Sequence, residues 1–192
     1  MWGVALLSLG AFGQLTLQEQ TKIDALRASG ADVRIERPIE GRPEIWVDFP
    51  KSIEDRALVP LSDCPSLTVL RILEGHVTDA GLKSLKNVPR LWLVVIKSER
   101  VTDQGCRVLS RLPALRKLDL MGARLSAAGL GALSSVQTLR ELYLHGARLR
   151  STSLTPLLTM THLERLSLPK QISASDMGRI RRALPKTQVS QY

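Results

Sequence analysis

A leucine that recurs every 24 residues is the feature that most constrains the fold of this chain. It stands at five successive positions, which are Leu67, Leu91, Leu115, Leu139 and Leu163. Two more apolar residues follow each of them in register, as Leu118 and Leu120 follow Leu115. A fixed period of about 20 to 50 residues predicts a stack of similar units, because each unit can bury its apolar side only against its neighbours.

The apolar spacing changes part-way along each unit. Leu118 and Leu120 alternate with polar residues, as in a strand, whereas Leu130 and Leu133 are three residues apart, as on one side of a helix. Consecutive strands joined by such crossovers run parallel. The sequence therefore predicts an α/β solenoid. We expect a right-handed arc with a parallel sheet on its concave face and short helices on its convex face.

Residues 14–50 depart from the repeat and predict an N-terminal cap. Thr16-Leu17-Gln18-Glu19 has the pattern of a capping box, and Gly30 is placed to end the helix that follows. Two alternating segments, around Val33 to Ile35 and Ile45 to Phe49, flank a turn at Glu40-Gly41-Arg42-Pro43 and predict a hairpin. The cap is needed because the first unit would otherwise expose its apolar edge to water.

About six units are expected over residues 45–192. The first is irregular, since Trp46 and Asp48 stand where later units have leucine, isoleucine or valine, which predicts a bulge or a one-residue slip. The sixth is one residue shorter than the others. Its helix should end at Leu184-Pro185, and Thr187 to Val189 predicts a last short strand that belongs to a C-terminal cap.

Residues 1–13 leave two alternatives open. Trp2 to Phe12 is an uncharged apolar run, and Ala11-Phe12-Gly13 is similar to a signal-peptide cleavage site, yet no basic residue precedes Lys22. The run is either a cleaved signal peptide or an apolar segment packed on the fold. In the first case the protein is secreted or periplasmic, and otherwise it is cytoplasmic. The run is too short to span a bilayer, so we expect no integral membrane segment.

The formal net charge is +9, and it is unevenly distributed. Residues 1–60 hold 7 Lys/Arg against 9 Asp/Glu, whereas the rest of the chain holds 20 against 9. A basic repeat body favours acidic partners and also keeps an elongated protein soluble. No RNA- or DNA-reading motif accompanies the charge, so nucleic acid is not favoured as the partner. Cys64 and Cys106 occupy apolar positions in different places of the repeat and are expected to be buried and unpaired.

These repeats resemble the leucine-rich repeat family. The blocks LTVLRILEGHVTDAGLKSLKNVPRL (67–91) and LRKLDLMGARLSAAGLGALSSVQTL (115–139) carry its L-x-x-L-x-L framework, followed by a helix start of the V-T-D-A-G-L type. That variant is similar to bacterial repeats common in planctomycetes and to the cysteine-containing repeats of ubiquitin-ligase adaptors. The resemblance implies a binding scaffold. It also implies Asn, Thr or Cys just after each strand, where this chain instead has Gly75, Glu99, Ala123 and Ala147, so looser turns are expected.

Strand alternation predicts which side chains line the concave face. Cross-strand neighbours there form a charge ladder, in which Glu141 stands between Lys117 and Arg165. An aromatic pair beside a carboxylate suits an interface hot spot. We predict a protein partner bound mainly by Tyr143, His145, Asp119, Glu141, Arg71 and Lys97. Val69, Leu73, Leu93 and Val95 would expose an apolar area on the same face, open to a partner or to the N-terminal cap.

A basic column on the turn after the strand supports an alternative function. Arg100, Arg124 and Arg148 stack with His76 at the repeat period and could bind an anionic polymer such as a nucleic acid or an acidic glycan. The explanation that we favour is an exposed turn that merely tolerates long polar side chains. The three histidines occupy unrelated positions in their units, so we expect no enzyme activity, cofactor or metal. We also expect the protein to be a monomer.

Overall fold

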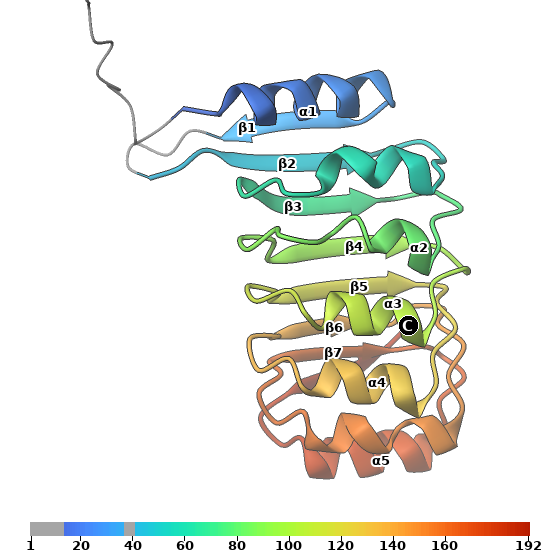
Figure 1. The fold of residues 1–192 in the computed structure, drawn as a ribbon. Coiled ribbons are helices and arrows are strands. Elements are labelled where there is room, and N and C mark those ends of the chain that lie inside the picture. The colour runs from blue at the N-terminus through green and yellow to red at the C-terminus, as the bar shows by residue number, and fades with distance from the viewer. Residues whose placement is uncertain (1–13, 37–40) are drawn as a thin grey trace, which may run out of the picture.

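The computed structural model describes residues 14–36 and 41–192. The signal-peptide prediction for residues 1–13, and Glu40 of the predicted turn, lie outside the described residues. One sheet of eight strands runs the length of the described chain in sequence order, and the helices stack along one side of it (Figure 1). The strands are β1 (Asp32–Glu36), β2 (Glu44–Phe49), β3 (Leu67–Ile72), β4 (Leu93–Lys97), β5 (Lys117–Met121), β6 (Glu141–Tyr143), β7 (Arg165–Leu168) and β8 (Gln188–Gln191).

A helical segment follows each strand from β2 to β7, which makes six strand–helix units. The α-helices are α1 (Leu17–Ala28), α2 (Asp79–Leu82), α3 (Asp103–Leu109), α4 (Ala127–Ser134) and α5 (Ala174–Ala183). The 3₁₀ segments are η1 (Asp55–Leu61), η2 (Ser151–Ser153) and η3 (Thr155–Thr159). β1 pairs antiparallel with β2, and all later pairs are parallel. The predicted α/β solenoid is confirmed: an open arc with its sheet on the concave face and its helices on the convex face.

The N-terminal helix is anchored to the solenoid by its own cap. Thr16 and Glu19 form the predicted capping box, and a Glu19 carboxylate oxygen also accepts the Ser66 amide at 3.2 Å. Burial acts to raise the pKa of Glu19, but the hydrogen bonds from Ser66 and Thr16 outweigh it and hold the pKa below its ordinary value. Ile23 and Leu26 on the inner side of α1 are fully buried.

The first unit contains the predicted irregularity. The pairing of β2 with β3 shifts between Ile45 and Trp46, which face Leu67 and Val69. Thr68 is therefore the extra residue on β3, and the shift aligns Val47 with Leu70. This places the apolar residues of β2 in the core, although they stand one residue out of register with the 24-residue repeat of the later units.

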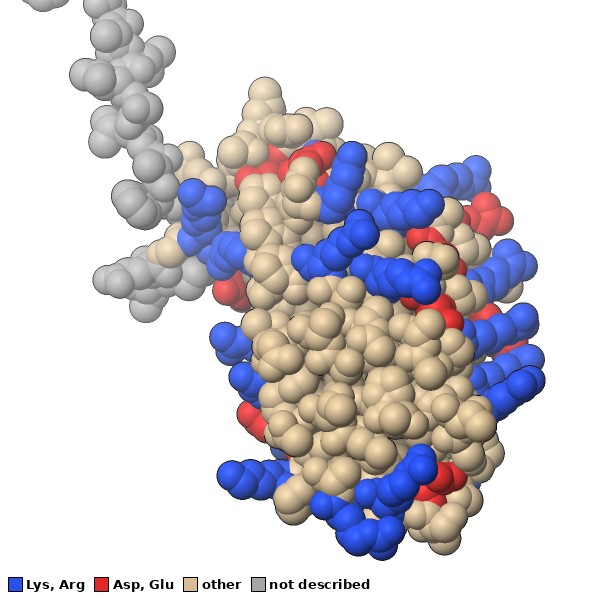
Figure 2. Space-filling model, turned by 60° about the horizontal axis from the view of Figure 1, so that its bottom comes forward, with Lys and Arg blue, Asp and Glu red and all other residues tan. Residues whose placement is uncertain are grey.

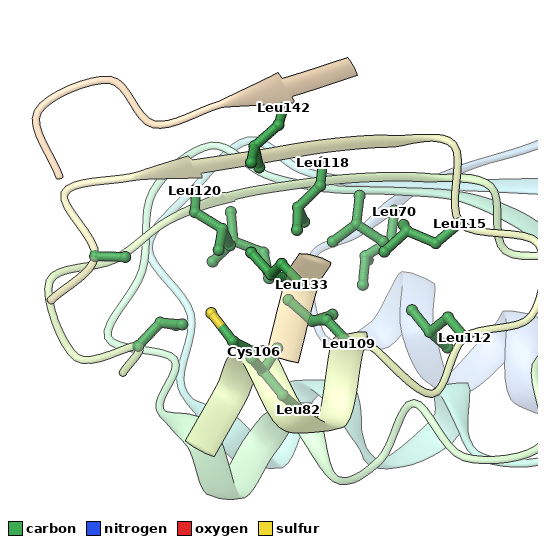
Figure 3. Packing of buried hydrophobic residues seen from close by; sticks show 14 of the residues in the cluster. Leu70, Leu82, Cys106, Leu109, Leu112, Leu115, Leu118, Leu120, Leu133 and Leu142 are labelled. Carbon is green, nitrogen blue, oxygen red and sulfur yellow. The ribbon is translucent and has the colours of Figure 1, made fainter. Parts of the chain in front are cut away.

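The core is a continuous aliphatic layer between sheet and helices. Leu118 and Leu120 of β5 point toward Leu109 and Cys106 on α3 (Figure 3). Cys64 and Cys106 are both buried and free, as predicted. Burial raises the pKa of the Cys64 thiol to about 11 and that of Cys106 to about 12, so both remain protonated and unreactive.

A ladder of aspartates joins successive units on the convex side. Asp79 Oδ1 accepts the Thr102 amide at 2.8 Å and the Gly105 amide at 2.9 Å, and its Oδ2 accepts the Thr102 hydroxyl at 2.6 Å. Asp55 bonds Thr78, and Asp103 bonds Ser126, in the same way. The predicted caps Thr78 and Thr102 are therefore each tied to the preceding unit by a carboxylate.

The turns after the strands are closed by main-chain bonds. The amides of His76, Arg124 and Arg148 donate to the preceding unit's Ile53, Val101 and Ala123 carbonyls at 2.8, 2.9 and 2.8 Å. Ser98 adds a side-chain bond to the Val77 carbonyl at 2.7 Å. These bonds replace the side-chain ladder that the resemblance implied, so the turns are held without Asn at Glu99 or Ala123.

Candidate functional site

An aromatic cluster lies at the C-terminal end of the concave face. Tyr143 ends β6, His145 follows two residues later, and their ring centroids are 5.7 Å apart. Tyr192 follows β8, where its amide donates to the Leu168 carbonyl at 2.9 Å, and its ring lies edge-on to His145 at 5.3 Å. His145 Nε2 is hydrogen-bonded to the buried Ser167 hydroxyl at 2.8 Å. The cluster therefore contains both tyrosines of the chain.

Glu141 is the centre of the predicted charge ladder. Its carboxylate lies 3.0 Å from Lys117 Nζ and 3.0 Å from Arg165 Nη1, and it accepts the Tyr143 hydroxyl at 2.8 Å. Burial acts to raise the pKa of Glu141, but these partners outweigh it and lower the pKa below its ordinary value. Lys117 also lies over the Tyr143 ring, 5.1 Å from its centroid. Glu141 thus positions Tyr143 and is fully engaged within the chain.

Asp119 lies beneath the aromatic cluster, where it pairs across the strands with Tyr143. One oxygen of its carboxylate is buried and has no hydrogen-bond partner among the described residues. Burial raises the pKa of Asp119 above its ordinary value, and the nearby His145 and Lys117 offset only part of that effect. A buried acceptor without a donor costs the fold the desolvation of that oxygen.

Arg71 is committed to the fold. Its Nε and Nη2 donate to the two oxygens of Asp48 at 2.5 and 2.7 Å, and Arg34 donates to the same carboxylate at 2.7 Å. Burial acts to raise the pKa of Asp48, but the two arginines outweigh it and hold the pKa low. This bidentate pair links the N-terminal hairpin to β3. The Arg71 guanidinium therefore stabilises the fold and is not free to bind a partner.

The expected apolar area on the N-terminal part of the concave face needs a correction. Val69 is only 2% exposed, because it lies between Trp46 and Leu93 in the strand register and these larger side chains cover it. Leu93 and Val95 are half-buried, and only Leu73 is exposed, at 43%. These four side chains therefore do not form the open apolar area that the sequence predicted.

Lys97 and His145 meet the arginine column in a second feature, which we call the edge groove. It is a groove of about 850 Å³ at the carboxyl ends of the strands. Its lining includes Lys97 and His145 on one side and His76, Arg100 and Arg124 on the other. Arg148 is exposed and forms an ion pair with Glu99 at 3.2 Å. Basic side chains gather along the margins of the molecule and leave the centre of the face in view uncharged (Figure 2).

The structure assembles no recognisable catalytic or metal-binding geometry from the residues that it describes. None of them form a group of three His, Cys, Asp or Glu side chains that could hold a metal. His162 is half-buried and far along the repeat from His145, and burial lowers its pKa, with Arg140 adding to that effect. No helix in the described part of the chain is long and apolar enough to cross a membrane.

Sequence reasoning missed three residues of these sites. Tyr192 lies outside the repeat period, so no repeat position connected it with His145. Asp48 and Glu99 were recognisable as acidic residues, but their pairing with Arg71 and Arg148 depends on the register after the bulge and on the twist between units. Only charge complementarity between columns could have indicated these pairs.

The geometry is that of an open leucine-rich repeat solenoid, and comparison with solved structures agrees with this fold. The chain is similar to an internalin (inlF) from Listeria monocytogenes, with a TM-score of 0.56 and 20% identity, over 78% of this chain and 47% of that one. It is also similar to internalin C2 (inlC2) from the same organism, with a TM-score of 0.51 and 17% identity, over 70% of this chain and 66% of that one.

The chain thus spans about half the length of the first internalin and slightly under two thirds of the second. By sequence, no protein-family model and no curated protein matches it. At this level of identity the likeness establishes the leucine-rich repeat fold, which the periodicity predicted.

Proposed function

We propose that this chain is a non-catalytic protein-interaction module that binds a protein partner through the concave face of its sheet. The observation that carries the proposal is the cluster of Tyr143, His145 and Tyr192 at the C-terminal end of the concave face, where Asp119 stands beside Tyr143 in the strand register. Aromatic side chains held rigidly by neighbours offer large contact area at small entropic cost, and such residues dominate protein interfaces. The leucine-rich repeat scaffold supports the same function, since extended concave surfaces suit partner binding.

The cluster is held in place before any partner arrives. The Tyr143 hydroxyl is bound by Glu141, and His145 is bound by Ser167. Tyr192 has 66% of its surface exposed, which leaves it accessible to a partner. The preordered rings reduce the entropy lost on binding.

Affinity capture from a nuclease-treated native extract tests this proposal. Wild type is compared with Tyr143→Ala/His145→Ala and, separately, with Tyr192→Ala. A control variant, Gln137→Ala/Thr138→Ala, changes exposed residues outside the concave face. We expect one protein to be captured by wild type and by the control, and lost with both aromatic variants. Equal capture by all four proteins, each shown to be folded by circular dichroism, would exclude the concave face as the site.

A second function, binding of an anionic polymer, is favoured by one observation. Arg100 and Arg124 have no carboxylate partner within ion-pair distance among the described residues, although most cations of the concave face do. Binding of heparin or of single-stranded DNA through these arginines should weaken steeply with salt, since each neutralised phosphate releases counterions. Affinity that does not change with salt excludes this alternative.

We also propose the finer assignments that the sequence suggested. The aspartate ladder supports planctomycete-type repeats, because it depends on the aspartate of the V-T-D-A-G-L helix start. We propose a monomer, with a secreted or periplasmic location if residues 1–13 are cleaved and a cytoplasmic one otherwise. Mass spectrometry of the native protein tests the cleavage, and light scattering tests the monomer.

A further inference from the structure

The edge groove is built from four columns of side chains that repeat every 24 residues. Long side chains form its two borders: Lys97, Met121 and His145 at the strand ends, and His76, Arg100 and Arg124 on the turns. Between the borders the lining includes Gly75, Gly122 and Gly146. Gly122 and Gly146 have positive φ angles of 79° and 61°, which favour glycine, so the floor has no side chain at these two positions, whereas Glu74 and Ser98 stand in the same column of the earlier units.

The charges bordering this groove are available for a ligand. Lys97, Arg100 and Arg124 have no carboxylate within 4.0 Å in the part of the chain that the structure describes, and all three are exposed. By contrast, Arg71, Lys117 and Arg165 on the concave face each have a carboxylate partner at 3.0 Å or less. The unpaired positive charge of the concave side is therefore concentrated at the groove.

The lining distinguishes between classes of anionic ligand. Glu74 and Glu99 also face the groove, and a polymer charged at every residue would be repelled by them. Apart from His76 and His145 there is no ring in the lining on which a nucleic acid base could stack. A peptide can place carboxylates opposite the cations and uncharged residues opposite Glu74 and Glu99, and its main chain can approach the floor closely at Gly122 and Gly146.

We infer that the edge groove binds an extended acidic segment of a protein partner, with glutamates or aspartates opposite Lys97, Arg100 and Arg124. This inference rests on the proposed function in that the partner is a protein. The groove crosses the ends of four neighbouring strands. Because neighbouring strands are about 4.8 Å apart, it is about 14 Å long from the first of these strands to the fourth. An extended chain advances about 3.3 Å per residue, so a segment of about five residues fills the groove.

Fluorescence anisotropy with a labelled acidic hexapeptide, of alternating glutamate and glycine, tests the inference at about physiological ionic strength. The groove variant is Arg100→Glu/Arg124→Glu. The matched control, Arg107→Glu/Arg116→Glu, makes the same change in net charge at exposed positions outside the groove. We expect the groove variant to bind the peptide at least about tenfold more weakly than wild type, and the control to bind within about twofold of it.

Three results would overturn the inference. Equal weakening by both charge variants would indicate only long-range attraction to a basic protein. Tighter binding of a labelled thymidine hexanucleotide than of the peptide would assign the groove to nucleic acid. Absence of peptide binding to folded wild type would leave the groove without this ligand.

The Tyr143→Ala variant separates this inference from the proposed function, because Tyr143 does not line the groove. We expect it to bind the hexapeptide as wild type does while failing to capture the partner protein. If the peptide does not bind but Tyr143-dependent capture of the partner persists, only the inference about the groove is contradicted. If the Tyr143→Ala variant still captures the partner and still binds the peptide, only the concave-face proposal is contradicted.

Discussion

Each aspartate of the convex ladder requires a glycine in the next unit. A Cβ at Gly129 would overlap the Asp103 carboxylate, and the same holds for Gly81 with Asp55 and for Gly105 with Asp79. The chain varies the two positions together: where the fourth unit has Ala127 in place of the aspartate, the fifth has Ser153 in place of the glycine. The glycines are therefore explained by packing against a carboxylate.

Gly129→Ala tests this explanation against Gly131→Ala on the same helix. The first change should lower the free energy of unfolding by about 2 kcal/mol, because the new methyl group overlaps Asp103. The second should raise it by up to about 1 kcal/mol, because nothing lies within 4 Å of that site and alanine favours helix. Urea denaturation measures both. Similar effects of the two substitutions would refute the packing argument.

The buried carboxyl of Asp119 makes stability depend on pH in a defined direction. Because burial raises its pKa in the folded state, the folded protein holds this proton more tightly than the unfolded chain does. Its contribution to stability is fully present below the unfolded pKa and is lost as the pH rises through the folded pKa. Asp119 therefore disfavours folding at neutral pH.

Asp119→Asn removes this titration. We expect the variant to melt at a higher temperature than wild type at about pH 7, and the difference to shrink as the pH falls below about 3, where the carboxyl is protonated in both states. Melting curves followed by circular dichroism across this range measure the effect. A melting temperature lower than that of wild type at neutral pH would show that the charged carboxylate stabilises the fold.

At the element scale, the helical layer changes character where the aspartate ladder ends. Three units with a Thr or Ser cap bonded by an aspartate contain the α-helices α2, α3 and α4. In the next unit Arg150 occupies the cap position without a side-chain cap bond, and the chain forms the 3₁₀ segments η2 and η3 instead. A cap bond satisfies amides that the first helical turn leaves free, so its loss favours the shorter, tighter turns.

Restoring the repeat pattern should restore the first helical turn of this unit, while Pro156, which has no amide to donate, still interrupts the helix there. The triple variant Ala127→Asp/Arg150→Thr/Ser153→Gly recreates the cap, its carboxylate and the space for it, and should raise the free energy of unfolding by about 1 kcal/mol. The helical signal in circular dichroism should increase as well. Ser153→Gly alone should lower stability by about 0.5–1 kcal/mol, because only backbone freedom is gained. A triple variant no more stable than this single variant would contradict the role of the ladder.

The whole molecule is held together by contacts between nearest neighbours. Each unit packs on the units before and after it, and the core runs without interruption from Ile23 on α1 to Leu184 after α5. β1 and β8 form the two edges of the sheet, each with one paired side. In such a stack the middle units have two stabilising interfaces and the terminal units have one.

Hydrogen–deuterium exchange should therefore be graded along the chain. We expect the amides of β4 and β5 to exchange most slowly, at the rate of global unfolding, and those of β8 to exchange first through local opening. Exchange measured by mass spectrometry on peptides from each strand provides the comparison. Equal protection in β5 and β8 would show that the solenoid unfolds only as one cooperative unit.

The sequence by itself determined the repeat, the alternation of a strand with a helical segment, the capped N-terminal helix and the bulge near Trp46. These features depend on residues close in sequence or one period apart, and 24-residue spacing brings such residues into contact directly. The helix caps at Thr78 and Thr102 were predictable for the same reason. The aspartate ladder has the same period and was recognisable in principle from the joint change at Ala127 and Ser153.

The tertiary structure alone decided which polar groups are free. Arg71 on the concave face and Arg148 in the arginine column both looked free to bind a ligand until the register and the twist between units paired them with Asp48 and Glu99. Tyr192 reached His145 only because β8 adds to the sheet. The sequence pattern predicts which side-chain atoms stand at each position. Which charges and rings pair with one another depends on distances between units, and these are set by the curvature and the register of the sheet.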